Sequence, residues 1–530
     1  MPRPGSSHSI CAVATVVLLV TGCSSSDAPS VPDHAQSSSA ESTSITSEAE
    51  PREAPKATAD AGERGGERPR SLSDLLIGSQ DHAAGDQQES GAKVNVSSNS
   101  AAAGTVLQVD ADALRSQGIR TLFGKHITIY TDLPASDVVD GLPQIFDLAV
   151  PQWARYFHVA AADVSQWHVY GILMSDPDKF RAVQLLTDDV PPFLHGYQQG
   201  DRFWAYEQPS DYYLRHIVLH EGTHAFMNNV MGGAGPPWYM EGVAELMATH
   251  HWDGTELTLR YMPKTNEEVP YWGRLKIIRD KFAASEALML ADVMRLEHSA
   301  FMEVDAYAWA WAAAAFLDGH PAYQARFRGL RNYVKDDSQH FTRRFENQLV
   351  NQLRQVDEEW QLFVMHAEYG YDFKRAAVQY REGDRLPPGG ADVEVTSQRG
   401  WQSSGYRLEA GQSYQITASG RFQVGAEEGP WWSEANGITL HYYQGRPLGM
   451  LVGNVRFDQA VPGIANLGRP VPLGVARQVR PEKSGTLYLR INESPAGLAD
   501  NEGVLHVHIR PVDATADGTL PGASGKPDFP

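Results

Sequence analysis

The chain has 530 residues, of which 42% are hydrophobic and 21% are charged, and its formal net charge is −20. This charge argues against a nucleic-acid partner, because binding to phosphates needs a basic surface that the composition does not supply. The two cysteines, Cys11 and Cys23, lie near the start, so the rest of the chain has no disulfide framework and no thiolate ligand. Any metal ion must therefore be held by His, Asp, Glu or carbonyl groups.

Residues 1–22 have the pattern of a signal peptide. An apolar stretch at 12–20 is too short to cross about 30 Å of hydrocarbon as a helix. Small residues then lead to Cys23, and the sequence LVTGC at 19–23 resembles a bacterial lipobox. The resemblance implies cleavage before Cys23, a lipid on its thiol, and a lipoprotein exported to the cell envelope and tethered to a membrane. Ser24, which is not Asp, implies passage to the outer membrane where the cell has one; the alternative is an ordinary secretory signal.

Two terminal segments have the composition of disordered chain. Residues 23–104 are rich in Ser, Ala, Glu, Pro and Gly, and residues 512–530 are similarly poor in apolar pattern. Such segments bury too little apolar surface to offset their conformational entropy, so we interpret them as a tether and a tail. About 400 residues remain for folding, which is enough for two or three domains. We place these domains at 105–385 and 386–511.

The first of these domains begins with strand patterns and continues with helical ones. The sequence predicts strands at 126–131 and 168–174, a helix at 135–157, and a further strand at 203–206. Two positions stay open for the last strand: the core, or a sheet edge where it would pair with an extended substrate. From 271 to 381, apolar residues recur at helical spacing. The predicted fold class of the chain is α+β.

A short motif in this domain has the spacing of a metal site. His220 and His224 form an H-E-x-x-H pattern, and on a helix their imidazoles share one face and can bind one ion. A Gly/Pro turn at 232–237 leads to a second helix, where Glu241 can supply a third ligand and leave a fourth position open. Glu245, one turn later, can accept a hydrogen bond from the other ring nitrogen of a ligand histidine. The alternative is a pair of helices with buried polar residues.

The motif and the sequence WYMEGVAE at 238–245 together resemble the gluzincin, or peptidase MA-like, clan of zinc metallopeptidases, over roughly residues 120–380. The resemblance implies a zincin-like catalytic unit in which His220, His224 and Glu241 bind Zn²⁺. It also implies hydrolysis of peptide bonds by metal-activated water, with Glu221 as the general base.

Other residues near the motif have more than one interpretation. Peptide hydrolysis needs a group that stabilises the oxyanion, and Tyr307 resembles the helix-borne tyrosine of gluzincin-like families. Tyr261 and Tyr271 compete for this role, and the alternative is that the Ala- and Trp-rich helix around Tyr307 is core. Gly222 inside a helix costs about 1 kcal/mol relative to Ala, so it predicts a close approach by another segment. We expect three further histidines to be surface or packing residues: His216, His250 and His251.

Alternating apolar residues replace helical spacing after residue 390, and strands with Gly-rich turns over 386–511 predict an antiparallel β-sandwich. The loop at 491–503, INESPAGLADNEG, resembles the calcium loop of galactose-binding bacterial lectins of the PA-IL type. The resemblance implies a Ca²⁺-dependent sugar site that uses Glu493, the Gly497 carbonyl, Asp500 and Asn501. Glu493 departs from the Asp of these lectins, and Gly497 stands at the mid-loop ligand position. The alternative is a loop whose polar residues only shape turns.

Two functions therefore stay open. The first is a cell-surface zinc metallopeptidase that acts on a peptide or protein, with or without attached glycans. The second is a carbohydrate-binding surface adhesin with a degenerate metallopeptidase unit. A third reading, an inactive scaffold that holds zinc, is disfavoured by Glu221, because an inert site does not need a base.

Overall fold

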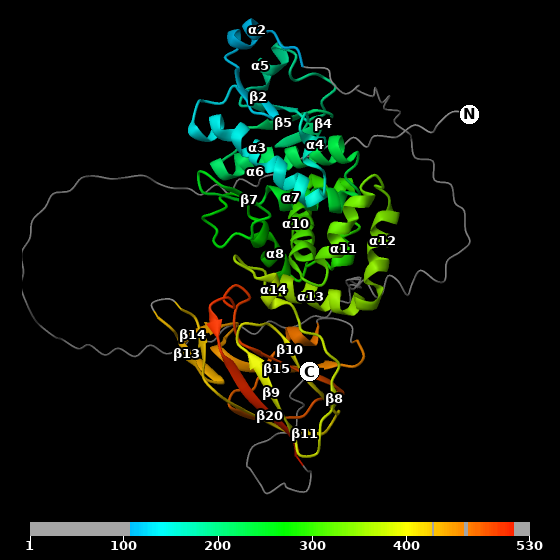
Figure 1. Ribbon diagram of the computed structural model, residues 1–530, viewed down its shortest axis with the longest axis vertical. Coiled ribbons are helices and arrows are strands. Elements are labelled where there is room, and N and C mark those ends of the chain that lie inside the picture. Colours follow the sequence, from blue (N-terminus) through cyan, green and yellow to red (C-terminus); the bar gives the residue numbers. More distant parts are fainter. Residues whose placement is uncertain (1–106, 427–428, 461–464, 513–530) are drawn as a thin grey trace, which may run out of the picture. The chain divides into compact units, whose positions relative to one another are not determined.

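The computed structural model describes residues 107–426, 429–460 and 465–512, all of which belong to one compact unit of the chain (Figure 1). The predicted signal peptide, Cys23, the tether at 23–104 and residues 513–530 of the tail lie outside the described residues. In the described part, no helix is long and apolar enough to cross a membrane. The described chain is a mixture of helix and sheet, which is compatible with the predicted α+β class.

A five-stranded sheet with the order β1-β2-β3-β5-β4 begins the described chain. Its strands are β1 Arg120–Phe123, β2 Ile127–Thr131, β3 Val169–Met174, β4 Gly196–Gln199 and β5 Arg202–Tyr206. Strands β2, β3 and β5 are parallel, and β1 and β4 are antiparallel edges. Helix α3, Asp137–Phe157, connects β2 to β3. The predicted strands at 126–131, 168–174 and 203–206 and the helix at 135–157 are confirmed, with small shifts at their ends.

The two faces of this sheet contribute to different cores. Phe203 on β5 packs in the core with α3 and α6, whereas its neighbour Trp204 packs in the core with Leu114 of α2 and Phe180 of α5. Because β5 lies between β3 and β4, the core position of the two that the sequence left open is confirmed, and the alternative position at the sheet edge was wrong. The edge next to β5 is β4, which was not predicted because Gly-Tyr-Gln-Gln has no apolar alternation. The short helices here are α2 Ala111–Ser116, α4 Ala161–Val164 and α5 Pro177–Ala182.

Two helices, α6 Asp211–Phe226 and α7 Pro237–Ala248, follow the sheet. The Ser210 side chain caps α6 by accepting a hydrogen bond from the Tyr213 N–H. A π-helical turn, Met227–Met231, extends α6 and ends at Gly232, whose φ of 76° favours glycine. Pro237 lies in the first turn of α7, where its missing N–H costs no hydrogen bond.

The region from 250 to 376 is a small hairpin followed by helices, and the helical structure predicted from 271 onward is confirmed. Its elements are β6 His250–Trp252, β7 Leu257–Leu259, α8 Arg274–Ala283, α9 Leu290–Val293, α10 Val304–Gly319, α11 Gln324–Gly329, α12 Gln339–Leu349, α13 Leu353–Met365 and α14 Phe373–Ala376. Helix α10 packs against both α7 and α8 (Figure 1). Its Ala- and Trp-rich sequence is buried on nearly all sides, as a central core helix requires.

Residues 384–512 form β-strands, as the alternation predicts. They are β8 Asp384–Arg385, β9 Ala391–Thr396, β10 Gln402–Leu408, β11 Ser413–Ser419, β12 Phe422–Val424, β13 Trp432–Ser433, β14 Asn436–Tyr443, β15 Arg446–Phe457, β16 Val471–Pro472, β17 Ala476–Val479, β18 Gly485–Ile491, β19 Asn501–Glu502 and β20 Val504–Val512. One sheet has the order β14-β15-β18-β10-β8 and another β17-β11-β20-β9, and buried side chains of both form a single core. A small third sheet has the order β13-β12-β19. Val512, which the sequence analysis assigned to the tail, ends β20.

Candidate metal centre

The predicted metal ligands His220, His224 and Glu241 come together between α6 and α7. The Nε2 atoms of the two histidines lie 3.1 Å apart, and Glu241 Oε2 lies 3.3 Å from each of them. All three side chains are buried, and their ligand atoms form a group that could hold a metal ion. The local spacing within each helix and the close packing of the two helices therefore produce the three-residue group.

Two glycines allow the helices of the site to pack closely on their neighbours. A Cβ at Gly222 of α6 would lie 2.6 Å from Phe146 and 2.8 Å from Trp153 of α3. A Cβ at Gly242 of α7 would lie 2.6 Å from the Ala310 carbonyl oxygen of α10. All three distances are shorter than a real Cβ contact, so the close approach that the sequence predicts at Gly222 is confirmed.

The donor set fits a tetrahedral cation. Ligand atoms bonded at about 2.0–2.1 Å to a tetrahedral Zn²⁺ lie about 3.3–3.4 Å apart, close to the spacing of the three ligand atoms here. The site is also rich in buried negative groups, since Glu221, Glu241 and Glu245 are all at most 2% exposed. Burial alone lowers the pKa of His220, but its contacts with Glu241 and Glu245 outweigh burial and raise this pKa to about 10. The site therefore attracts positive charge.

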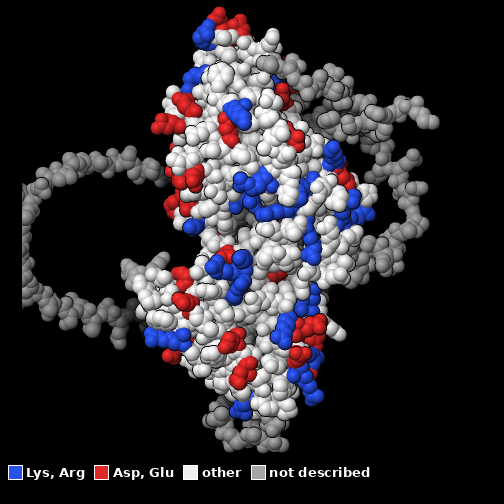
Figure 2. Space-filling model, viewed as in Figure 1, with Lys and Arg blue, Asp and Glu red and all other residues white. Residues whose placement is uncertain are grey.

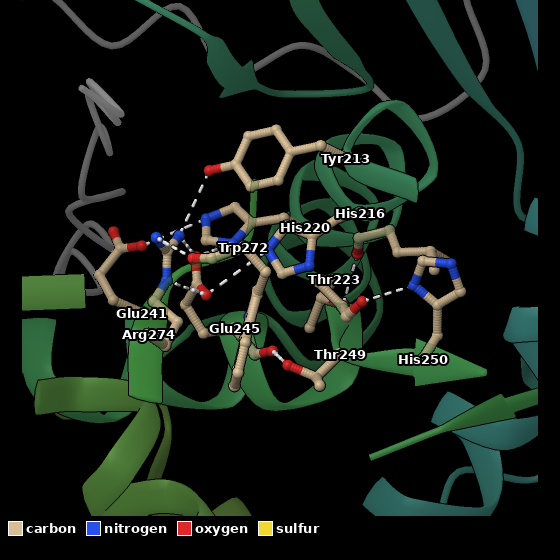
Figure 3. A network of polar contacts seen from close by, with 12 residues as sticks. Tyr213, His216, His220, Thr223, Glu241, Glu245, Thr249, His250, Trp272 and Arg274 are labelled. Atoms are coloured by element: carbon tan, nitrogen blue, oxygen red, sulfur yellow. Dashed lines mark hydrogen bonds and ion pairs between the residues drawn. The ribbon is translucent and has the colours of Figure 1, made fainter. Parts of the chain in front are cut away.

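Glu245 contacts His220 at the ring nitrogen that does not face Glu241, and a buried arginine in turn holds Glu245 (Figure 3). Glu245 Oε1 lies 3.3 Å from His220 Nδ1, the ring nitrogen that faces away from Glu241. Arg274, 2% exposed at the start of α8, donates hydrogen bonds of 3.0 Å from Nε and Nη2 to the two oxygens of Glu245. Against the effect of burial, Arg274 and His216 lower the pKa of Glu245 well below its usual range. A bidentate pair of this kind fixes the carboxylate, which in turn orients the imidazole.

Arg274 was not predicted from the sequence. It donates further hydrogen bonds to the Tyr213 hydroxyl at 3.3 Å and to the Trp272 carbonyl oxygen at 3.2 Å. The available signal was an arginine at the start of an apolar helix, because Leu275 and Ile278 beside it are also fully buried. A buried arginine in such a place requires a partner within the fold.

His216 lies one turn before His220 and is fully buried. Of the two roles expected for it, surface residue or packing residue, it therefore has the second. Its ring stacks on Tyr213 with centroids 5.2 Å apart, and its Nε2 lies 3.4 Å from Glu245 Oε2. With His220 and Glu245 it forms a second group that could hold a metal ion. Because Arg274 already neutralises Glu245 there, the group with Glu241 is the better cation site.

Glu221 is fully buried, and neither of its carboxylate oxygens has a hydrogen-bond partner in the described structure. Burial raises its pKa to about 8. The edge strand β4 passes directly over it, and a Cβ at Gly196 would overlap Glu221 Oε1. Gly196 therefore leaves the space that this carboxylate fills. Sequence reasoning missed Gly196, because the strand that carries it was not predicted.

Tyr307 lies beside the predicted ligands. Its ring, fully buried on α10, has its centroid 6.1 Å from that of His220 and 5.1 Å from that of Phe301. The competing Tyr261 donates a hydrogen bond of 3.3 Å to Glu268, and Tyr271 is 61% exposed. Of the three candidate tyrosines, Tyr307 is the one whose described ring contacts include a predicted metal ligand.

The predicted calcium loop follows β18 and is tied down by hydrogen bonds. Asn501 Nδ2 donates to the Ser397 carbonyl at 3.0 Å, and its buried Oδ1 has no hydrogen-bond partner among the described residues. Asp500 Oδ2 accepts a hydrogen bond from the Ala426 N–H at 3.2 Å. Glu493 is 7% exposed, burial raises its pKa to about 7, and a Cβ at Gly497 would lie 2.7 Å from its Oε1.

In the described part of the chain, no residue of this loop belongs to a group of three or more His, Cys, Asp or Glu side chains that could hold a metal ion. Both such groups lie on α6 and α7. A cation at the loop would therefore need amide and backbone carbonyl oxygens in addition to the carboxylates, as Ca²⁺ commonly does.

No protein-family model and no curated protein matches the chain. Solved structures with some similarity include the EclA N-terminal domain, a PllA-like lectin, at 19% identity and a TM-score of 0.19, covering 24% of this chain and all of that one. Another is an IMPa metallopeptidase in complex with T-antigen, at 10% identity and a TM-score of 0.15, covering 67% of this chain and 38% of that one. At these TM-scores the similarities carry no argument about this chain, whose function must be judged from its own residues.

Proposed function

We propose that this protein is a zinc metallopeptidase, with a zincin-like catalytic unit in residues 105–385. The observation that carries the proposal is the convergence of His220, His224 and Glu241 in one buried group, with Glu221 next to them on α6. Two nitrogens, one carboxylate oxygen and a nearby unpartnered carboxylate are the set that metal-assisted hydrolysis requires.

Each residue has a distinct task in this proposal. Zn²⁺, when bound, supplies a Lewis acid and lowers the pKa of a water ligand to about 7. In this proposal Glu221 takes a proton from the attacking water and returns it to the leaving amine. Tyr307 donates a hydrogen bond to the oxyanion. Glu245, held by Arg274, keeps the His220 ring in the orientation that directs Nε2 toward the ion.

The test is zinc content together with cleavage of a peptide library. The full chain should copurify with about one zinc ion, and Glu221→Ala should keep the zinc while it abolishes cleavage. His224→Ala should lose both. A matched control is His251→Ala, because His251 is an exposed histidine outside the group. A wild-type protein without zinc would contradict the proposal, and so would a Glu221→Ala variant with full activity.

The sandwich supports a second function, which is binding of a carbohydrate through a Ca²⁺ ion at Glu493, Gly497, Asp500 and Asn501. The observation that favours it is the unpartnered buried Oδ1 of Asn501 in the loop. An exposed aromatic side chain, Trp432, lies two strands away in the same small sheet. In the small third sheet, Gln423 pairs with Glu502 on one side and with Trp432 on the other, and Trp432 is 47% exposed. Aromatic faces beside polar groups suit the apolar and polar faces of a sugar.

A glycan array separates the two functions. Ca²⁺-dependent binding that is lost in Asn501→Ala, together with zinc-dependent cleavage of peptides, would assign both functions to one chain. Binding without cleavage of any peptide would favour the adhesin with a degenerate metallopeptidase unit.

We also propose that the mature protein is a lipoprotein of the cell envelope, anchored through Cys23. Metabolic labelling with a fatty acid should mark the wild type, and Cys23→Ala should remove the label. A labelled Cys23→Ala protein would contradict this assignment.

A further inference from the structure

A cavity of about 370 Å³ lies between the end of α13 and the sandwich, away from the metal centre. Its lining includes three arginines, Arg446, Arg469 and Arg490, together with His366, Met365 and Pro470. The described lining contains no Asp or Glu. This composition differs from the face of the molecule that Figure 2 shows, where both acidic and basic side chains are exposed.

Arg490 is the buried member of the three. It lies on β18, a strand that is buried throughout, and is only 6% exposed. Its Nε is buried without a hydrogen-bond partner, and its guanidinium lies over the Trp401 ring, 5.2 Å from the centroid. For comparison, Arg456 on the neighbouring β15 donates a hydrogen bond of 2.7 Å to Glu358. Among the described contacts, Arg490 has no such carboxylate partner.

None of the groups that line the cavity beside Arg490 carries a negative charge that would neutralise it. Arg446 donates hydrogen bonds to the carbonyl oxygens of Gln444 at 3.3 Å and Pro470 at 3.0 Å, which are neutral acceptors. His366 Nδ1 lies 2.8 Å from the Tyr443 hydroxyl. Burial and Arg446 lower the pKa of Arg490, although Tyr443, Tyr371 and Glu493 act in the opposite direction. The cavity therefore has a surplus of positive charge.

A buried guanidinium without a counter-ion is unfavourable, and the surplus is best explained by an anion that comes from outside the chain. The planar guanidinium matches a carboxylate, sulfate or phosphate by donating two parallel hydrogen bonds. A volume of about 370 Å³ is at the lower end of the range of small-molecule sites, about 300–1,000 Å³, and exceeds what a bare ion fills.

We propose that this cavity binds a small acidic molecule through its oxyanion group, with Arg490 at the buried end and Arg446 and Arg469 nearer to solvent. The ligand class is a small organic acid or an acidic sugar that carries a carboxylate, sulfate or phosphate. The site is independent of the metal centre, so it stands or falls separately from the proposed peptidase activity.

The test is thermal unfolding of the full chain at constant ionic strength, with sodium chloride as the reference. The probes are sodium sulfate, sodium phosphate, sodium acetate and sodium D-glucuronate, with D-glucose as the neutral partner of glucuronate. At least one oxyanion should raise the melting temperature by several degrees in a saturable way, and glucose should not. Saturation by sulfate or phosphate alone would identify an inorganic anion, and stronger saturation by glucuronate an acidic sugar. Stabilisation by none of the probes would overturn the proposal.

Variants decide whether Arg490 is the binding group. Arg490→Met keeps much of the side-chain volume, so without anions it should melt at the same temperature as the wild type or higher, and it should lose the response to anions. Arg510→Gln is the matched control, because Arg510 is exposed on β20, and it should respond as the wild type does. Arg446→Gln should raise the anion concentration needed for half of the rise in melting temperature at least fivefold. This variant also tests the site if Arg490→Met does not fold. An unchanged response in both Arg490→Met and Arg446→Gln would overturn the assignment.

Discussion

Two buried arginines, Arg274 in the candidate metal centre and Arg490 in the sandwich, have similar exposure but different surroundings. They are 2% and 6% exposed. Arg274 donates two hydrogen bonds to Glu245, and the interaction raises its pKa despite burial. Arg490 faces an aromatic ring and a cavity, and burial lowers its pKa. The chain balances the charge of Arg274 internally, whereas that of Arg490 has no carboxylate partner among the described contacts.

The difference separates a charge that supports the fold from a charge that is available to a ligand. In the metal centre, Arg274 is needed because Glu245 would otherwise be a buried carboxylate next to Glu241 and Glu221. In the sandwich, the positive charge gives no comparable support. Removing the charge of Arg274 should therefore destabilise the protein, whereas removing the charge of Arg490 should not.

The largest expected effect is that of Arg274→Met. It leaves Glu245 buried without its partner, and breaking a buried pair in this way costs about 3–5 kcal/mol of unfolding free energy. The control is Arg490→Met, which is equally apolar but should not destabilise the protein. Urea unfolding of the two variants measures the contrast. Equal destabilisation in both would mean that both charges support the fold.

The second effect concerns catalysis and not stability. If Tyr307 donates to the oxyanion, Tyr307→Phe should lower kcat by about 10²–10³-fold, as loss of one oxyanion donor does. KM should change little, because the interaction forms in the transition state. The control is Tyr261→Phe, since the Tyr261 hydroxyl binds Glu268. A kcat for Tyr307→Phe equal to that of the wild type would leave Tyr307 as a core residue only.

The third effect tests why α6 carries a glycine. In Gly222→Ala the added methyl group meets Phe146 and Trp153, and such overpacking costs about 1–3 kcal/mol. Gly141 on α3 is a matched control, because a Cβ there meets nothing within 4 Å. Gly141→Ala should stabilise the protein by about 0.5–1 kcal/mol through helix propensity. Thermal unfolding of both variants gives the comparison, and stabilisation by Gly222→Ala would show that α3 can move away.

The metal centre could be predicted further than the cavity because its ligands lie close together in the chain. His220, His224 and Glu241 sit on two consecutive helices, so helical spacing and one turn are enough to bring them together. Arg274 and Gly196 reach the same site from α8 and from β4, and no local pattern relates them to the motif. The cavity depends on the end of α13, the β14–β15 turn, residues 468–471 and β18. Its charge surplus exists only once these distant segments are packed.

The smallest expected effect is the pH dependence of calcium binding in the sandwich. Burial raises the pKa of Glu493 to about 7, so the folded protein holds a proton there that the unfolded chain loses near its ordinary value of 4.5. The stability from this proton is fully present below about pH 4.5 and is lost as the pH rises through about 7. Ca²⁺ needs the ionised carboxylate, so its affinity should be about tenfold weaker at pH 6 than at pH 8. Calorimetric titration with Ca²⁺ at both pH values measures this ratio.

Two variants test whether Glu493 is the group that titrates. Glu493→Gln should abolish binding, whereas Glu502→Gln should leave the ratio unchanged, because Glu502 is an exposed carboxylate of the same loop. Equal affinity at the two pH values would exclude Glu493 as a ligand, because a carboxylate that must lose a proton to bind Ca²⁺ cannot do so equally well above and below its pKa.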